Sequence, residues 1–210
     1  MWAYESVFYQ IYPIGFCGAP RVNDGITVPR IRKAADWAEH IARLGCNAVY
    51  FSPIFESDSH GYDTRDFRKV DCRLGTNADF AAVCETLHEH GIKVVVDIVP
   101  NHSSNLHEWF KAALAAAPGS PERDRYIFRD GKGPNGDQPP TDWIASFGGP
   151  AWTRVPDGQW YLHLFDVTQA DLNWENPEVR EELKNVLRFW KTKGIKGFRF
   201  DVVNLISKPE

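Results

Sequence analysis

The chain of 210 residues lacks the features that would place it in several protein classes. No apolar run approaches the ~18 residues that span a bilayer, so we expect no membrane partner. The first residues do not combine a basic stretch with an apolar one, which argues against a secretory leader. Positive charge is not in excess, because the formal net charge is −4. A chain without a basic surface is a poor match for nucleic acid, which we exclude as a partner.

Cysteine is also sparse: the chain has four, with no C-x-x-C pair of the kind found in metal and redox sites. We therefore predict free thiols, no bound metal and a cytoplasmic protein. Aromatic residues, in contrast, are abundant, with 8 Trp, 7 Tyr and 13 Phe. Most of them are expected in the core, although such an excess is also compatible with a carbohydrate ligand.

Short apolar runs alternate with longer amphipathic ones, which is the pattern of βα units in an α/β fold with a parallel sheet. We predict strands at 7–13, 47–52, 93–98 and 197–202, and helices at 31–44, 77–90 and 176–193. Asn77 and Asn176 are expected to cap their helices, and Gly45 and Gly91 to end the helices before them.

Residues 103–168 break this regularity, because they are rich in Gly, Pro and Asp. A structureless loop of this length is uncommon in a compact domain, so we predict a small inserted subdomain with a helix near 107–117 and strands near 159–165. A closed eight-stranded barrel takes ~250 residues. The rest of the chain therefore fits the first half of a (β/α)8 TIM barrel, strands 1–4. The predicted divisions are 1–102 (three βα units), 103–168 (insert) and 169–210 (third helix and fourth strand).

Polar residues follow the predicted strands at their C-terminal ends, where function gathers in barrels of this kind. Arg199 and Asp201 alternate onto one strand face. A guanidinium beside a carboxylate favours the ionised form, which a carboxylate nucleophile requires. A purely structural ion pair explains this spacing equally well.

The residues at the other strand ends are open to two interpretations. Asp97, inside an apolar strand, needs polar partners, so a structural role is favoured for it and for Asn101. His102 could donate to a sugar hydroxyl or be an ordinary satisfied polar residue. Tyr62 and Asp63 could form a sugar platform and a hydroxyl acceptor, or simply belong to a turn.

Taken together, these motifs resemble the alpha-amylase family of retaining glycoside hydrolases. DIVPNH (97–102) and GFRFDVVN (197–204) are similar to two family signatures. QADLN (169–173) and HGYDTRDF (60–67) are similar to stretches of oligo-1,6-glucosidases and alpha-glucosidases. The resemblance covers the N-terminal half of such enzymes and implies short α-glucoside oligosaccharides as substrates.

The resemblance also implies roles for single residues. Asp201 matches the nucleophile and Arg199 the arginine that orients it. Val202 is similar to the valine of enzymes that act on α-1,6 links. The implied sugar-binding residues are Tyr62, Asp63, His102 and Phe165, with structural support from Asp97, Asn101 and Gln169.

The resemblance leaves part of the catalytic machinery unaccounted for. In this family the acid/base Glu follows the fifth strand, whereas Glu175 and Glu178 here fall on a predicted helix start with a solvated face. We therefore predict that the isolated chain is inactive or nearly so. The alternative is a catalytically silent fragment, either a carbohydrate-binding module or a half-barrel that self-associates through its open sheet edges.

No cofactor is expected. The segment after the first strand reads GAPRVNDG and lacks the D-x-N-x-D pattern of a calcium loop. Asn101 leaves a second calcium position of the family open.

Overall fold

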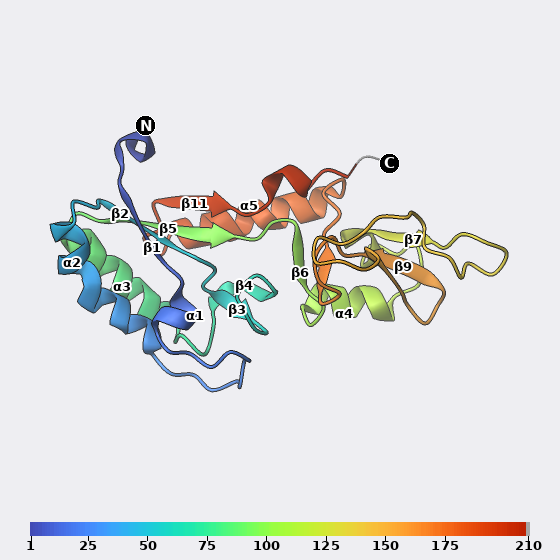
Figure 1. The fold of residues 1–210 in the computed structure, drawn as a ribbon, viewed down its shortest axis with the longest axis horizontal. Helices are drawn as coiled ribbons and strands as arrows, with labels where there is room; N and C mark the ends of the chain where they lie inside the picture. The colour runs from blue at the N-terminus through green and yellow to red at the C-terminus, as the bar shows by residue number, and fades with distance from the viewer. Residues whose placement is uncertain (209–210) are drawn as a thin grey trace. The chain divides into compact units, whose positions relative to one another are not determined.

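The computed structural model describes residues 1–208. Its central sheet has four parallel strands in the order β1-β2-β5-β11 (Figure 1). Their bounds are β1 Phe8–Ile11, β2 Ala48–Phe51, β5 Lys93–Ile98 and β11 Gly197–Phe200. Each lies within a predicted strand, which confirms the α/β class with a parallel sheet. Val94, Val96 and Ile98 of β5 are fully buried, as expected for a parallel strand that is covered on both faces.

The first predicted helix, 31–44, is split in two. Residues Arg30–Trp37 form the 3-10 helix η2, and only Ala38–Arg43 form the α-helix α2. The buried residues of this segment are spaced three or four positions apart, and a spacing of three also suits the three-residue turn of a 3-10 helix. Gly45, with φ +80°, follows the helix as predicted.

The second predicted helix is α3, Asn77–Glu89, which packs with α2 on one side of the central sheet (Figure 1). The expected cap was wrong: Thr76, not Asn77, caps this helix, through a capping box with Asp79. Thr76 has the extended backbone and the side-chain oxygen that the cap position requires. Asn77 instead accepts a hydrogen bond from the backbone N–H of Val70, 2.8 Å away, at the end of strand β4 (Thr64–Val70).

Two strands, β3 (Phe55–Ser57) and β4 (Thr64–Val70), pair in a segment where no strand was predicted. The indole of Trp190 packs beneath them: it stacks on Phe55 with ring centroids 5.0 Å apart and donates to the carbonyl of Phe67 at 2.7 Å. Trp190 belongs to α5, Pro177–Lys191, whose predicted cap is confirmed, since Asn176 accepts from the N–H of Glu178.

The chain forms two compact units. Unit 1 comprises residues 1–62, 66–99 and 184–201, and unit 2 comprises 63–65, 100–183 and the residues from 202 onward. The central sheet belongs to unit 1. The predicted divisions 1–102, 103–168 and 169–210 remain a proposal about the domains of the protein.

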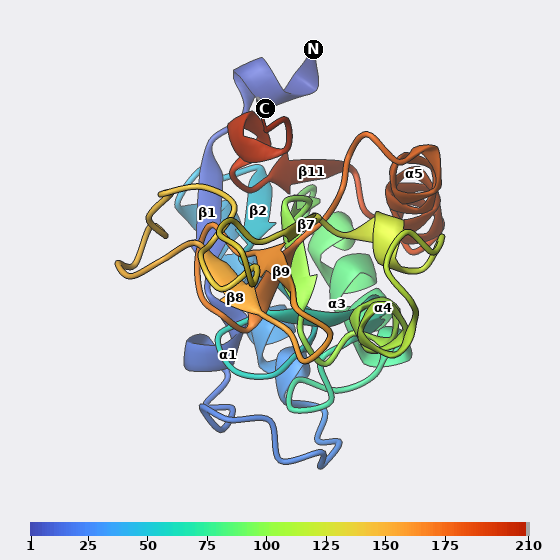
Figure 2. The same ribbon diagram turned by 90° about the vertical axis from the view of Figure 1, so that its right-hand side faces the viewer.

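Unit 2 contains two small antiparallel sheets. One pairs β6 (His102–Ser104) with β10 (Gln169–Asp171). The other has the order β7-β9-β8 (Figure 2). Its strands are Phe128–Asp130, Gln159–Leu162 and Trp152–Arg154, in that order. The helix expected near 107–117 is α4, Glu108–Ala115, capped by His107, and β9 is the strand expected near 159–165.

Short helical segments complete the described chain: η1 Trp2–Glu5, α1 Pro13–Phe16, η3 Arg123–Arg125 and η4 Val203–Leu205. Within residues 1–208, no helix combines the length and the apolar character needed to cross a membrane.

Candidate functional site

The strand register of unit 1 brings Arg199 and Asp97 together. Arg199 on β11 is the register partner of Asp97 on β5. Its Nη1 donates to both carboxylate oxygens of Asp97, at 3.2 Å each, and also to Oδ1 of Asp201. The predicted Arg199–Asp201 pair is therefore present, and one guanidinium serves both carboxylates.

Asp201 lies just beyond the strand rather than within it. The fourth strand ends at Phe200, two residues before the predicted end. Val202 takes φ +39°, a left-handed conformation that is rare for a β-branched residue and breaks the strand. The N–H of Asp201 still donates to the carbonyl of Ile98 at 2.8 Å, so its backbone remains tied to β5.

Two tyrosine hydroxyls complete this group, which consists of Tyr50, Tyr62, Asp97, Arg199 and Asp201 and is called the carboxylate cluster below. The hydroxyls of Tyr50 and Tyr62 both donate to Oδ2 of Asp97, the second at 3.3 Å. Tyr50 was not predicted. The register places it beside Val95, whose side chain shares a sheet face with Asp97. A hydroxyl within an otherwise apolar strand was the signal that could have revealed it.

Burial and charge set the protonation of the carboxylate cluster. Burial raises the pKa of Asp97, while the hydrogen bond from Tyr50 and the charge of Arg199 oppose that rise. Burial and the nearby Asp97 charge raise the pKa of Tyr62 to about 12, and burial with the Asp97 hydrogen bond raises the pKa of Tyr50. For Arg199, burial favours a lower pKa but is outweighed by the hydrogen bond to Asp201 and the charge of Asp97, so the pKa is raised. Near neutral pH both phenols are therefore donors and the guanidinium is charged.

A second group of predicted residues meets in unit 2, around His102 on β6. Its Nδ1 lies 3.1 Å from the amide nitrogen of Asn101, and its Nε2 lies 3.0 Å from that of Gln169. The ring of Phe165 is 5.2 Å from the imidazole, and Phe147, which was not predicted, is 5.8 Å from Phe165. Four predicted residues are thus brought together here. Asp63 is also buried in unit 2, with 3% exposure.

A buried ion pair adjoins Asn101. The ammonium of Lys208 lies 2.6 Å from Oδ1 of Asn101 and 3.1 Å from Oδ2 of Asp171. The amide of Asn101 also donates to Oδ1 of Asp171 at 3.1 Å. Burial raises the pKa of Asp171 to about 6 and lowers that of Lys208, and each opposes the shift of the other. The pairing of these two residues was not predicted, because nothing in the sequence links positions so far apart.

This ion pair also bears on calcium. The resemblance left a calcium position open at the Asn101 side-chain oxygen, beside which lies the Asp171 carboxylate. Both are bonded to the chain's own ammonium. Calcium takes six to eight oxygen ligands, and this arrangement does not fit it.

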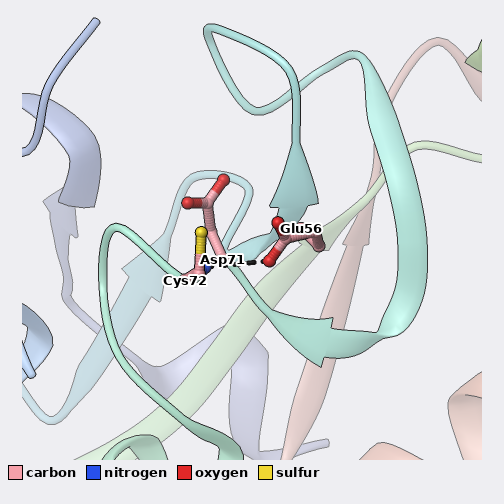
Figure 3. Close-up of side chains that lie close together, drawn as sticks. All are labelled: Glu56, Asp71 and Cys72. Atoms are coloured by element: carbon pink, nitrogen blue, oxygen red, sulfur yellow. Dashed lines mark hydrogen bonds between the residues drawn. The ribbon is translucent and has the colours of Figure 1, made fainter. Parts of the chain in front are cut away.

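A third cluster, Glu56, Asp71 and Cys72 in unit 1, has donor atoms within 4.8 Å of one another (Figure 3). Its carboxylates already have cationic partners. Arg73 donates to Asp71 through Nε and Nη2, at 2.8 and 2.6 Å, and Lys69 lies 3.2 Å from Glu56. The backbone N–H of Cys72 donates to Glu56 at 2.9 Å, the dashed line of Figure 3. These bonds give the cluster a structural role, with its charge balanced by protein groups.

Unit 2 also contains a cavity of about 730 Å³, lined in part by Trp143, Trp152 and Trp174. Of the residues in the carboxylate cluster, the group around His102 and the adjoining ion pair, Lys208 alone is in its lining. The cavity is therefore largely distinct from the group around His102.

The comparisons with known proteins identify the family. The catalytic-domain model of alpha amylase matches residues 10–210. The chain belongs to the alpha-amylase family. This confirms the resemblance drawn from DIVPNH and GFRFDVVN, and accounts for the parallel sheet, since the family's catalytic domain is a TIM barrel.

Members of the alpha-amylase family with different activities are similar to this chain. The oligo-1,6-glucosidase of Parageobacillus thermoglucosidasius is 42% identical over 214 residues, which cover 100% of this chain and 37% of that protein. The crystal structure of trehalose-6-phosphate hydrolase from Bacillus licheniformis is 43% identical with a TM-score of 0.86, covering 99% of this chain and 37% of that one. An isomaltulose synthase variant from Erwinia rhapontici, in complex with D-glucose, is 36% identical with a TM-score of 0.87, covering 100% of this chain and 36% of that one. The chain thus spans little more than a third of the length of these relatives.

Proposed function

We propose that this chain is the N-terminal part of a retaining glycoside hydrolase that cleaves α-glucosidic bonds of short oligosaccharides, with Asp201 as nucleophile. The observation that carries the proposal is the bonding of Arg199. Its guanidinium contacts Asp97 and Asp201 at the C-terminal ends of β5 and β11, the end of a barrel where active sites form. A neighbouring guanidinium favours the ionised form of a carboxylate and orients it, which suits a nucleophile.

In the proposed reaction a carboxylate oxygen of Asp201 attacks the anomeric carbon while the bond from that carbon to the leaving oxygen breaks. A carboxylic acid protonates the leaving oxygen, and a water molecule, deprotonated by the same group, then hydrolyses the glycosyl–Asp201 ester with net retention. That second carboxyl must stand ~5–5.5 Å from the nucleophile. The resemblance places it after the fifth barrel strand, so we propose that it comes from outside residues 1–210 and that the isolated chain is inactive or nearly so.

The other candidate residues receive supporting roles. Tyr62, Asp63, His102 and Phe165 would hold the sugar at the cleaved bond, with Asn101 and Gln169 fixing His102. Val202 is similar to the valine of enzymes that act on α-1,6 links, which favours substrates with that linkage. Its left-handed backbone supports a functional constraint next to Asp201, because strained backbone is tolerated where function requires it.

The proposed architecture is the first half of a (β/α)8 barrel. β1, β2, β5 and β11 would be its strands 1–4, and most of unit 2 would be a subdomain inserted after the third. The direct sequence connection from β5 into unit 2, and the return through α5 to β11, support this arrangement.

The nucleophile is tested in a chimera. Residues 1–210 of this chain replace the matching segment of the Parageobacillus thermoglucosidasius oligo-1,6-glucosidase, and release of nitrophenol from p-nitrophenyl α-glucoside is measured. We expect activity, and we expect Asp201→Asn to reduce kcat by about 10³-fold or more, as for other nucleophile losses. Asp24→Asn, which alters an exposed turn, is the matched control and should leave kcat unchanged.

An active chimera that retains its kcat after Asp201→Asn would rule out Asp201 as the nucleophile. The isolated chain is assayed in parallel, and we expect no turnover above the background of its own Asp201→Asn variant. Turnover by the isolated chain, lost in that variant, would contradict the proposal that an acid from outside residues 1–210 is required.

A further inference from the structure

We propose that Tyr50 is a positioning residue of the carboxylate cluster: its hydroxyl fixes Asp97, and through Asp97 it fixes the guanidinium that is bonded to Asp201. The inference rests on the proposed function in that Asp201 is the group to be positioned. The contacts from which it is drawn, however, all lie within unit 1 and involve no substrate.

Asp97 is the central member of the carboxylate cluster. It is fully buried, and the hydrogen bonds recorded for its carboxylate within residues 1–208 come from three side chains, Tyr50, Tyr62 and Arg199. A buried carboxylate depends on such donors, because burial without them is costly. The orientation of Asp97 is therefore set by whichever of these donors is held most firmly.

Tyr50 is the donor with the firmest support. It lies on β2, an interior strand of the sheet that pairs on both sides, with β1 and with β5. Tyr62 follows the turn after β3 and makes a longer hydrogen bond, at 3.3 Å. Arg199 lies on β11, at the edge of the sheet, and its side chain is 46% exposed. Of the three, Tyr50 is the donor whose backbone is locked between neighbours.

The hydroxyl of Tyr50 therefore affects Asp201 indirectly. Asp97 and Asp201 compete for Nη1 of Arg199. Removing the Tyr50 hydroxyl weakens the ionised form of Asp97, because one donor to its Oδ2 is lost. If Asp97 were protonated or rotated, the Arg199 guanidinium would lose its bonds to Asp97 and would be held by Asp201 alone within the carboxylate cluster. Tyr50 thus holds the pair in place by favouring the ionised form of Asp97 and fixing its orientation.

The test is Tyr50→Phe, which keeps the ring and removes the hydroxyl. Aspartate labelled with ¹³C at its carboxyl carbon is incorporated into the chain, and the Asp97 and Asp201 resonances, assigned with Asp97→Asn and Asp201→Asn, are followed against pH. We expect the Asp97 midpoint to rise by about 1–2 pH units, as the loss of a hydrogen bond to a charged group implies. We also expect the Asp201 resonance to shift.

Tyr126→Phe is the matched control. Its hydroxyl is buried and pairs with the neutral Ser103, 2.7 Å away in unit 2. This variant should lose stability and leave both aspartate titrations unchanged. Tyr62→Phe tests the ranking of the two donors and should move Asp97 less than Tyr50→Phe does. If Tyr50→Phe does not fold by circular dichroism, Tyr50→3-fluorotyrosine, which strengthens the donor, should lower the Asp97 midpoint.

An Asp97 midpoint that Tyr50→Phe leaves in place, or that Tyr62→Phe moves further, would overturn the positioning role of Tyr50. This readout requires no turnover. The positioning role and the nucleophile are therefore tested independently. An active Asp201→Asn chimera would contradict Asp201 as the nucleophile without affecting the titration result.

Discussion

At the scale of single residues, the buried pair of Lys208 and Asp171 is where one substitution should cost most. Both side chains are at most 9% exposed. Lys208→Met leaves the Asp171 carboxylate buried without its cation, a change that typically costs about 3–5 kcal/mol. We expect a loss of this size in the free energy of unfolding, measured by urea denaturation at pH 7. Adding Asp171→Asn should recover most of it, because Asn retains an oxygen for the N–H of Leu164.

The same pair gives a pH dependence with a definite sign. Burial raises the pKa of Asp171 to about 6 in the folded chain. Between the unfolded pKa near 4 and this value, the folded chain therefore holds a proton that the unfolded chain has released. This contribution favours folding below the unfolded pKa near 4 and is lost as the pH rises through about 6. Lys208 opposes the rise in the pKa of Asp171, so Lys208→Met raises that pKa further and gains more stability from protonation than the parent chain does as the pH falls. The deficit of Lys208→Met should therefore shrink between pH 7 and pH 5. A deficit that is constant over this range, or a double variant no more stable than Lys208→Met, would contradict the account.

The site residues that sequence reasoning proposed and those it missed differ in a physical respect. Arg199 and Asp201 are two positions apart at the end of an apolar run, so strand alternation alone suggests their pairing. Tyr50 is hydrogen-bonded to Asp97, which lies 47 positions away in the sequence. Lys208 is hydrogen-bonded to Asn101 across 107 positions. Pairings of that kind depend on strand register and on tertiary packing, which local periodicity does not encode.

At the scale of elements, the capping box of α3 gives the clearest prediction. Thr76 accepts from the N–H of Asp79 at 3.2 Å, and the Asp79 carboxylate accepts from the N–H of Thr76 at 2.9 Å. Hydrogen bonds from Thr76 and Arg32 lower the pKa of Asp79. Thr76→Ala should therefore reduce the free energy of unfolding by about 1 kcal/mol at pH 7. Thermal unfolding followed by circular dichroism measures it.

The pH dependence of this cap runs opposite to that of Asp171. A depressed folded-state pKa contributes stability that is present above the unfolded value near 4 and is lost as the pH falls through the folded one. The difference between Thr76→Ala and the parent chain should narrow in acid. Asn77→Ala separates the two residues: it removes the bonds to Val70 and Arg68 and leaves the capping box intact. If Asn77→Ala lost more free energy of unfolding than Thr76→Ala, and if that loss narrowed in acid, Asn77 rather than Thr76 would be the cap.

Among the elements, the clarity of the hydrophobic pattern decided what the sequence could predict. Long amphipathic or uniformly apolar segments such as α3, α5 and β5 were predicted within a few residues of their bounds. Strands of three residues, such as β3, β6 and β10, are too short for an alternation pattern to stand out. The 3-10 helix η2 was predicted as part of an α-helix, because its apolar spacing is nearly that of an α-helix.

At the scale of the whole molecule, the central sheet of unit 1 has two open edges. Within the described residues, β1 and β11 each pair with a single strand. Phe8 on β1 is 43% exposed and Phe200 on β11 is 40% exposed. Unpaired edges that carry apolar side chains favour pairing with another chain, and two copies would supply the eight strands of a barrel. This observation favours the self-associating half-barrel as the second candidate for the isolated chain.

We therefore expect the isolated chain to be a dimer or a larger species by size-exclusion chromatography with light scattering. Charged side chains on edge strands oppose such pairing, so Phe8→Lys combined with Phe200→Lys should shift the chain toward the monomer. Val22→Lys is the control, because Val22 is 69% exposed and lies outside the strands of the central sheet. A monomeric parent chain would exclude edge pairing. Dissociation by Val22→Lys to the same degree would mean that general surface charge, rather than the sheet edges, governs the association.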